Sequence, residues 1–193
     1  MKKPVQDTRQ HLLDVTRSLM TYKGYTAVGL SEVVAAADIP KGSFYYYFKS
    51  KEDFGQALLE EYFADYLTTV DRLLGQKGSA AEQLMGYFQY WKETQGTDLP
   101  DDKCLVVKLG PEVCDLSEDM RDVLKKGTDA IIGRISDCIG RGQADGSISS
   151  DVPASLLAES LYQMWLGASL LAKLNKSTAP FETALGASRR ALA

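Results

Sequence analysis

Apolar positions recur three and four residues apart along almost the whole chain, which is the spacing of amphipathic helices. Three short helices are predicted first, over residues 12–23, 30–37 and 41–48. Lys23-Gly24 ends the first helix, and Ser31 is placed to cap the second. The tight turn at Asp38-Ile39-Pro40 separates the second helix from the third.

Longer helices are predicted for the rest of the chain. Ser50 caps a helix that continues to Leu74, and Ser79 with Glu82 forms a capping box for the next one. After a polar loop over residues 96–102, further helices are predicted over residues 104–109, 117–138 and 156–174, with a last one from about residue 180. The short helix from residue 104 is expected to end at Gly110-Pro111. No segment alternates apolar and polar residues over a useful length, so the predicted fold class is all-α.

The three N-terminal helices have the outline of a helix-turn-helix, in which the second helix of the pair enters the major groove of DNA. Here that helix covers residues 41–48. Phe44 and Phe48 lie one turn apart and are predicted to anchor it on its own core, whereas Tyr46 fits core and surface equally well. The residues expected to point outward are Lys41, Gly42, Ser43, Tyr45 and Tyr47.

The chemistry of these outward residues suits double-stranded DNA. Tyrosine hydroxyls bond phosphates, and tyrosine rings contact thymine methyl groups. Gly42 allows a close approach of the backbone to the duplex. Lys51, in the first turn of the following helix, is placed to pair with a phosphate.

Charge is distributed unevenly along the chain, whose formal net charge is −4. Residues 1–55 carry eight Lys and Arg against six Asp and Glu, whereas residues 56–193 carry fourteen against twenty. A basic N-terminal part on an acidic body agrees with DNA contact at one end. An excess of two positive charges is also common by chance.

Several classes of protein are disfavoured by composition. No apolar run approaches the roughly 18 residues that a membrane helix needs, and the N-terminal stretch lacks the apolar core of a signal peptide, so we expect a cytoplasmic protein without membrane contact. Three cysteines and a single histidine, His11, show no metal-ligand spacing, and no glycine-rich phosphate loop is present. We therefore expect no metal, no cofactor and no enzymatic activity.

The N-terminal segment resembles the DNA-binding domain of the TetR family over roughly residues 7–55. The resemblance lies in Gly24-Tyr25, in residues 30–37 and in residues 40–52, although Pro40 stands where many members carry a serine cap. It implies a homodimer with a DNA-binding domain over residues 1–50 and a sensing and dimerisation domain over residues 51–193. The positions that match the family's operator contacts are Ser31, Lys41, Gly42, Ser43, Tyr45, Tyr47 and Lys51.

An apolar stripe over residues 157–171 has two interpretations. With Phe181, Leu185 and Leu192 it forms either a four-helix interface between two subunits or a core within one subunit. Sequence does not separate these alternatives, and the family resemblance favours dimerisation through the last two helices.

Residues 103–109 and 112–120 resemble members of the family that respond to reactive electrophiles and oxidants through a cysteine. The matching position is Cys104, and Lys173 also matches. A helix N-terminus and the neighbouring Lys103 favour the thiolate of Cys104, whereas Asp101 and Asp102 oppose it.

These residues also have plainer interpretations, and for Cys104 it is a buried thiol without a sensing role. Lys173 is also explained as a lysine that extends to solvent near a helix end. Cys138 lies on an apolar stripe and is predicted to be buried and inert, and two nearby acids should suppress the thiolate of Cys114.

The alternative inducer is a planar hydrophobic molecule that binds without a covalent bond. Four aromatic residues could line its pocket, although aromatic stripes are more often core. They are Tyr87, Trp91, Tyr162 and Trp165.

Overall fold

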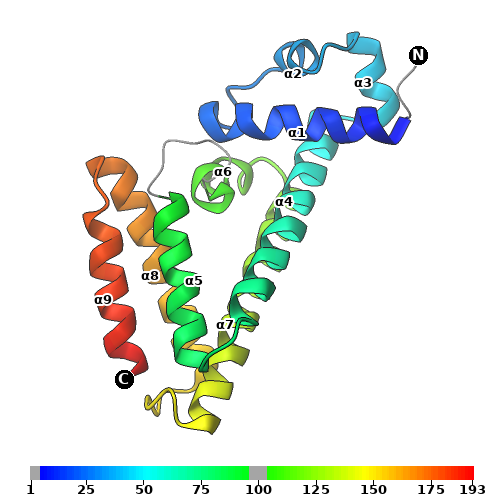
Figure 1. The fold of residues 1–193 in the computed structure, drawn as a ribbon. Helices are drawn as coiled ribbons and strands as arrows, with labels where there is room; N and C mark the ends of the chain where they lie inside the picture. Colours follow the sequence, from blue (N-terminus) through cyan, green and yellow to red (C-terminus); the bar gives the residue numbers. More distant parts are fainter. Residues whose placement is uncertain (1–4, 96–103) are drawn as a thin grey trace. The chain divides into compact units, whose positions relative to one another are not determined.

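The computed structural model describes residues 5–95 and 104–193, so the predicted loop over residues 96–102 and Lys103 lie outside the described residues. In the described ranges the chain is helical and contains no strand, which confirms the all-α prediction (Figure 1). The helices are α1 (Val5–Lys23), α2 (Leu30–Ala36), α3 (Lys41–Tyr47), α4 (Lys51–Leu74), α5 (Ala80–Gln95), α6 (Leu105–Val113), α7 (Glu118–Asp145), α8 (Ala154–Asn175) and α9 (Ala179–Leu192). None of these described helices is long and apolar enough to cross a membrane.

The chain divides into two compact units. The first combines Met1–Phe63 with Leu99–Lys125, and the second combines Ala64–Asp98 with Lys126–Ala193. Helices α1, α2 and α3 together are called the reading head. Helix α6 packs in the same unit as the reading head. The domain boundary predicted at residue 50 stays a prediction.

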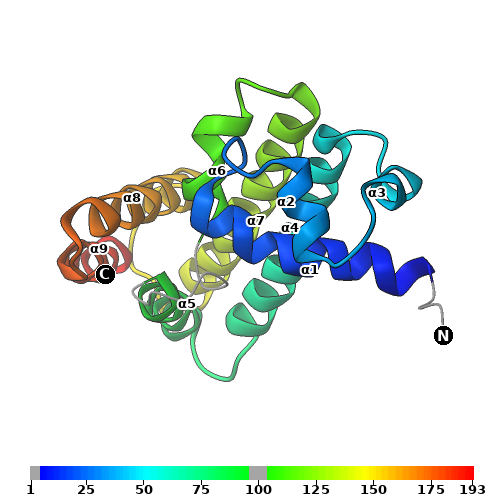
Figure 2. The ribbon, with the colours of Figure 1, turned by 90° about the horizontal axis from the view of Figure 1, so that it is seen from above.

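Aromatic rings at the junction of α3 and α4 organise the core of the reading head. Phe44 and Phe48 are buried, as predicted, with ring centroids 5.5 Å apart, and both contact Phe54 of α4. The guanidinium of Arg9 covers the Phe48 ring from α1 at 5.1 Å. Figure 2 shows α1, α2 and α3 grouped near the start of α4. The position of α3 is thus determined by side chains on its inner face.

Most predicted helix ends are confirmed. Gly24 follows α1 with φ of +99°, and its N–H donates to the carbonyl of Met20 at 2.8 Å. The Ser50 hydroxyl accepts the N–H of Asp53 at 3.1 Å, and Ser79 and Glu82 bond each other reciprocally. These contacts satisfy backbone groups that a helix terminus leaves without partners.

Four predicted helix ends are wrong. Helix α1 begins at Val5 rather than near residue 12, and α7 continues past residue 138 to Asp145. Ser31 does not cap α2, because Gly29 is extended and its carbonyl already accepts the N–H groups of Glu32 and Val33, so the helix begins before Ser31. Helix α6 continues through Gly110-Pro111 to Val113. The fully buried Val113 side chain anchors this extra turn, and tertiary packing outweighs the local cost of the proline.

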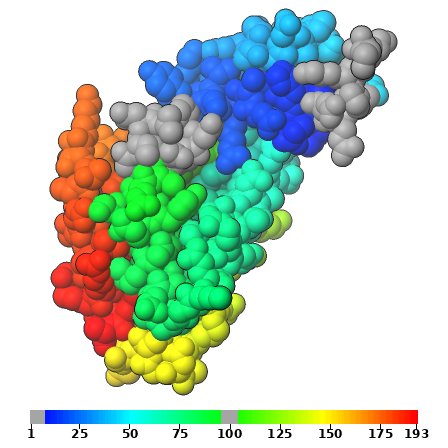
Figure 3. Space-filling view, in the orientation of Figure 1, coloured from blue at the N-terminus to red at the C-terminus, as the bar shows by residue number. Residues whose placement is uncertain are grey.

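Aromatic rings also fill the second unit, between α5, α8 and α9. Phe88 and Trp165 are stacked with an interplanar angle of 3° and centroids 4.9 Å apart. Both indole N–H groups in this core have buried acceptors, because Trp91 donates to Ser169 and Trp165 to Ser188, each at 3.0 Å. Figure 3 shows α5 and α9 packed side by side on the surface of this unit.

Candidate nucleic-acid interface and sensor site

The outer face of α3 presents tyrosine side chains to solvent. Tyr45 is 55% exposed and Tyr46 is 72% exposed, and the ring of Tyr47, which is half-buried, meets Tyr46 edge-on at 5.1 Å. Lys41 and Gly42 are also exposed, and Ser43 is half-buried. The sequence left Tyr46 undecided, and the structure places it on the surface beside the predicted contacts. Ser31 lies exposed on α2.

Lys51 has partners inside the protein. Its ammonium donates to the carbonyl oxygen of Tyr25 at 2.8 Å and lies 4.3 Å from the centroid of the Tyr25 ring. Burial lowers the pKa of Lys51 from its usual value. A phosphate would have to compete with these contacts, and the predicted phosphate bond stays a prediction.

Gly42 gives a direct test of close approach to DNA. A methyl group added there meets nothing within 4 Å, so Gly42→Ala should keep or slightly raise stability, by about 0.4–1 kcal/mol. Operator affinity should nevertheless fall, by about fivefold or more, because the methyl group would separate the backbone from the duplex. Thermal unfolding and fluorescence anisotropy measure the two effects.

Gly133→Ala is the matched control, because Gly133 lies in α7 and also has open space around it. It should change neither operator affinity nor the fold. An operator affinity of Gly42→Ala equal to that of the control would contradict a close approach at this position.

Cys104 is the N-cap residue of α6, as the sequence predicted, but its side chain is buried. The residue is 9% exposed, and the Tyr62 hydroxyl of α4 donates to its sulfur at 3.9 Å. Burial raises the pKa of the Cys104 thiol, against the opposing effect of the Val106 and Val107 N–H groups and of Tyr62. The helix N-terminus therefore points at the sulfur, but desolvation outweighs it.

The other two cysteines differ in environment. Cys138 is buried, its thiol donates to the carbonyl of Ala80 at 3.5 Å, and burial raises its pKa, which confirms the predicted buried thiol. Cys114 is half-buried at the C-cap of α6. Lys173 lies exposed in the last turn of α8, in the second unit, and its pairing with Cys104 stays a prediction.

The aromatic residues predicted to line a ligand pocket are packed against one another. Tyr87, Trp91, Tyr162 and Trp165 are all buried. Trp91 has its ring centroid 5.8 Å from Tyr87, 5.6 Å from Tyr162 and 5.8 Å from Trp165. The rings thus occupy the space between the helices themselves, which favours the core interpretation.

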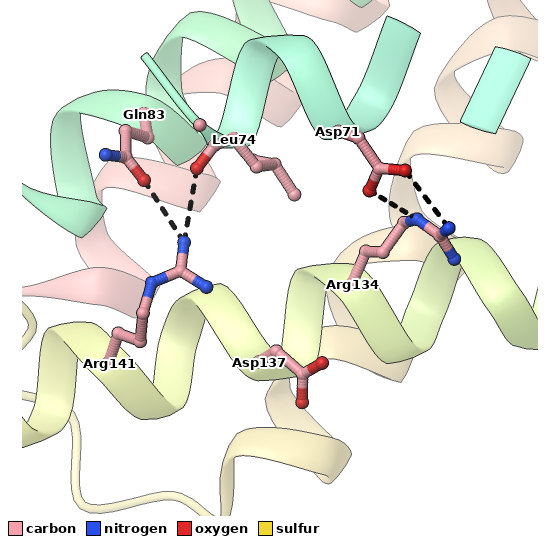
Figure 4. A pocket seen from close by; sticks show the side chains of 7 residues that line it. Asp71, Leu74, Gln83, Arg134, Asp137 and Arg141 are labelled. Atoms are coloured by element: carbon pink, nitrogen blue, oxygen red, sulfur yellow. Dashed lines mark hydrogen bonds and ion pairs between the residues drawn. The ribbon is translucent and has the colours of Figure 1, made fainter. Parts of the chain in front are cut away.

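A cleft of about 480 Å³ lies at the end of α4, beside α5 and α7 (Figure 4). Arg134 makes a two-pronged ion pair with Asp71, at 2.6 and 3.1 Å, and Arg141 donates to the Leu74 carbonyl and to Gln83, both at 3.2 Å. Asp137 supplies the second carboxylate, so the formal charges cancel. The arginines hold the end of α4 to its neighbours and do not form an anion site.

The two faces of α8 differ in exposure. The predicted stripe is largely internal, since Leu157, Leu161, Trp165 and Ala168 are buried in the second unit, although Leu171 is exposed. Beside this buried stripe, α8 carries exposed leucines: Leu156, Leu170, Leu171 and Leu174. The core interpretation therefore holds for the first set, and the second set is the apolar surface available to a partner.

The chain matches known families over most of its length. Residues 12–58 match the family described as "Bacterial regulatory proteins, tetR family", and residues 80–188 match "Tetracyclin repressor-like, C-terminal domain". The HTH-type transcriptional repressor NemR of Escherichia coli (strain K12) is 40% identical over 180 residues, which cover 93% of this chain and 90% of NemR. The HTH-type transcriptional repressor DhaR of Mycobacterium sp. (strain GP1) is 33% identical over 90% of this chain and 86% of DhaR.

Solved structures agree with these sequence matches. The crystal structure of E. coli NemR in its reduced form superposes with a TM-score of 0.92 at 39% identity, covering 97% of both chains. A regulatory protein TetR from Rhodobacter sphaeroides superposes with a TM-score of 0.85 at 31% identity, covering 95% of this chain and 98% of its own.

Proposed function

Because the chain belongs to the TetR family of bacterial regulatory proteins, we propose that it is a repressor released from its operator by reactive electrophiles or oxidants that act on Cys104. Its relatives are DNA-binding transcriptional regulators and not enzymes. To the family assignment the proposal adds the inducing signal, which is a reactive electrophile or oxidant. The observation that carries it is the location of Cys104 at the start of α6, in the same unit as the reading head.

In the proposed mechanism α3 enters the major groove and presents Lys41, Gly42, Ser43, Tyr45 and Tyr47 to the operator. Regulators of this family act as dimers, and two heads must lie about 34–36 Å apart to meet successive major grooves. The exposed leucines of α8 are the surface that we assign to the contact between subunits, because burying them in a partner removes apolar area from water.

Modification of Cys104 would disturb packing around a residue that is 9% exposed. With a quinone, the sulfur forms a bond to a ring carbon and the thiol proton is transferred to the product. The added atoms need space beside Tyr62, so either this ring or α6 must move. A difference of a few kcal/mol in operator affinity between the unmodified and the modified protein is enough to release it from DNA.

Cys104→Ser tests the covalent signal. We expect 1,4-benzoquinone to weaken operator binding of the wild type by about tenfold or more and to leave Cys104→Ser bound. Cys114→Ser is the matched control and should respond like the wild type. The rate of modification should rise as the pH increases from 6 to 8, because burial raises the pKa of the Cys104 thiol and the thiolate is the nucleophile.

Release of Cys104→Ser by the same compound would contradict covalent sensing. It would assign induction to reversible binding of a hydrophobic ligand. Fluorescence anisotropy with promoter DNA, together with mass spectrometry of each variant, distinguishes the two results.

A further inference from the structure

The turn between α1 and α2 is held by side chains of α6. The carboxylate of Glu112 accepts the backbone N–H of Thr26 at 3.0 Å and its hydroxyl at 2.7 Å. One turn earlier on α6, the ammonium of Lys108 donates to the carbonyl oxygen of Tyr22 at 3.0 Å. These contacts join residues 86 positions apart in the chain. They connect α6 directly to the reading head.

Gly24 provides the space that Glu112 occupies. It adopts a φ of +99°, which favours glycine, and a methyl group added there would collide with a carboxylate oxygen of Glu112. The glycine that ends α1 therefore has a second role, because it lets the carboxylate reach the backbone of the turn. Any other residue at this position would be strained, both by the positive φ and by its Cβ against the Glu112 carboxylate.

The charge of Glu112 suits this position. Although burial opposes ionisation, the hydrogen bonds from Thr26 and from the Tyr25 backbone, together with Lys108, lower the pKa of Glu112 below its ordinary value. Lys51 of α4 donates to the carbonyl oxygen of Tyr25 in the same turn. A carboxylate on α6 and an ammonium on α4 therefore both hold this turn.

We propose that Glu112 is a positioning residue, which holds the reading head in the orientation that binds the operator. A displacement of α6 changes the contact between Glu112 and Thr26, and this change alters how the reading head meets DNA. Cys104 and Glu112 lie eight residues apart, or about 12 Å along one short helix, so movement at the first is transmitted to the second. This inference rests on the proposed function only for the identity of the signal.

Operator affinity of Glu112→Ala tests the contact itself. We expect affinity to fall by about tenfold, because the unmodified protein no longer holds the head in the competent orientation. Benzoquinone should then reduce the operator affinity of the variant by about tenfold less than it reduces that of the wild type. The reason is that the variant already populates the released arrangement. Glu112→Gln, which keeps one acceptor oxygen, should lie between Glu112→Ala and the wild type.

Asp115→Asn is the matched control, because Asp115 is an exposed acid three residues away. It should leave both affinity and response unchanged. Thermal unfolding ensures that each variant is folded at the assay temperature, and hydrogen exchange should show loss of protection at the Thr26 amide in Glu112→Ala alone.

A double-mutant cycle with Thr26→Val separates positioning from general stability. Because Thr26 and Glu112 form one contact, the double variant should bind operator about as well as Glu112→Ala. Unchanged affinity in Glu112→Ala, or independent effects that multiply in the double variant, would overturn the proposal. A wild type that ignores benzoquinone would instead refute the sensing function, and the basal affinities would still test the contact.

Discussion

Replacement of Trp165 by alanine is expected to lower the free energy of unfolding by about 3–5 kcal/mol. The side chain is fully buried, lies flat against Phe88, and has its ring centroid 6.1 Å from that of Phe181. Its removal leaves a cavity among α5, α8 and α9. It also removes the indole N–H, which donates a hydrogen bond to the Ser188 hydroxyl. Denaturation in urea, followed by circular dichroism, measures the change.

Trp165→Phe is the informative partner of that variant. It keeps a ring against Phe88 but removes the indole N–H, so we expect a smaller loss of about 1–2 kcal/mol. A loss below about 1 kcal/mol in Trp165→Ala would contradict close packing. It would indicate that these aromatic residues surround a cavity, which a reversibly bound hydrophobic ligand would require.

Tyr45→Ala should weaken operator binding by about 1–3 kcal/mol for each head, and therefore by roughly 2–6 kcal/mol for a dimer that uses two. The Tyr45 ring is exposed, yet its inner edge lies against buried Phe44, with centroids 5.6 Å apart. This contact orients the ring before DNA arrives, so little conformational entropy is lost on binding. The free energy of unfolding should change by less than about 0.5 kcal/mol, because most of the side chain is in solvent.

Tyr22→Ala controls for the loss of an exposed tyrosine elsewhere in the reading head. Tyr22 is 78% exposed, but it lies near the end of α1 rather than on α3. Its replacement should leave operator affinity unchanged when both variants are titrated with promoter DNA at the same salt concentration. Equal affinities for Tyr45→Ala and the wild type would contradict the assignment of α3 as the recognition helix.

Local signals in the sequence determined the helices and the recognition face. Helical periodicity, the stop at Gly24 and the caps at Ser50 and Ser79 act between residues within about four positions, so they are visible in the sequence. Phe44 and Phe48 share a face for the same reason, and both are buried. The resemblance to the TetR family added what periodicity lacks, namely the expectation of DNA and of a sensing body.

Tertiary packing decided the features that depend on residues far apart in the chain. Aromatic rings from α5 and α9 pack against α8 and determine which of its faces is internal. Tyr62 of α4 contacts the sulfur of the buried Cys104. The contact of Glu112 with Thr26 spans 86 positions and needs the extra turn of α6 that Gly110-Pro111 argued against. Helix periodicity gives the face of a residue on its own helix, but the partner of that face depends on how the helices pack.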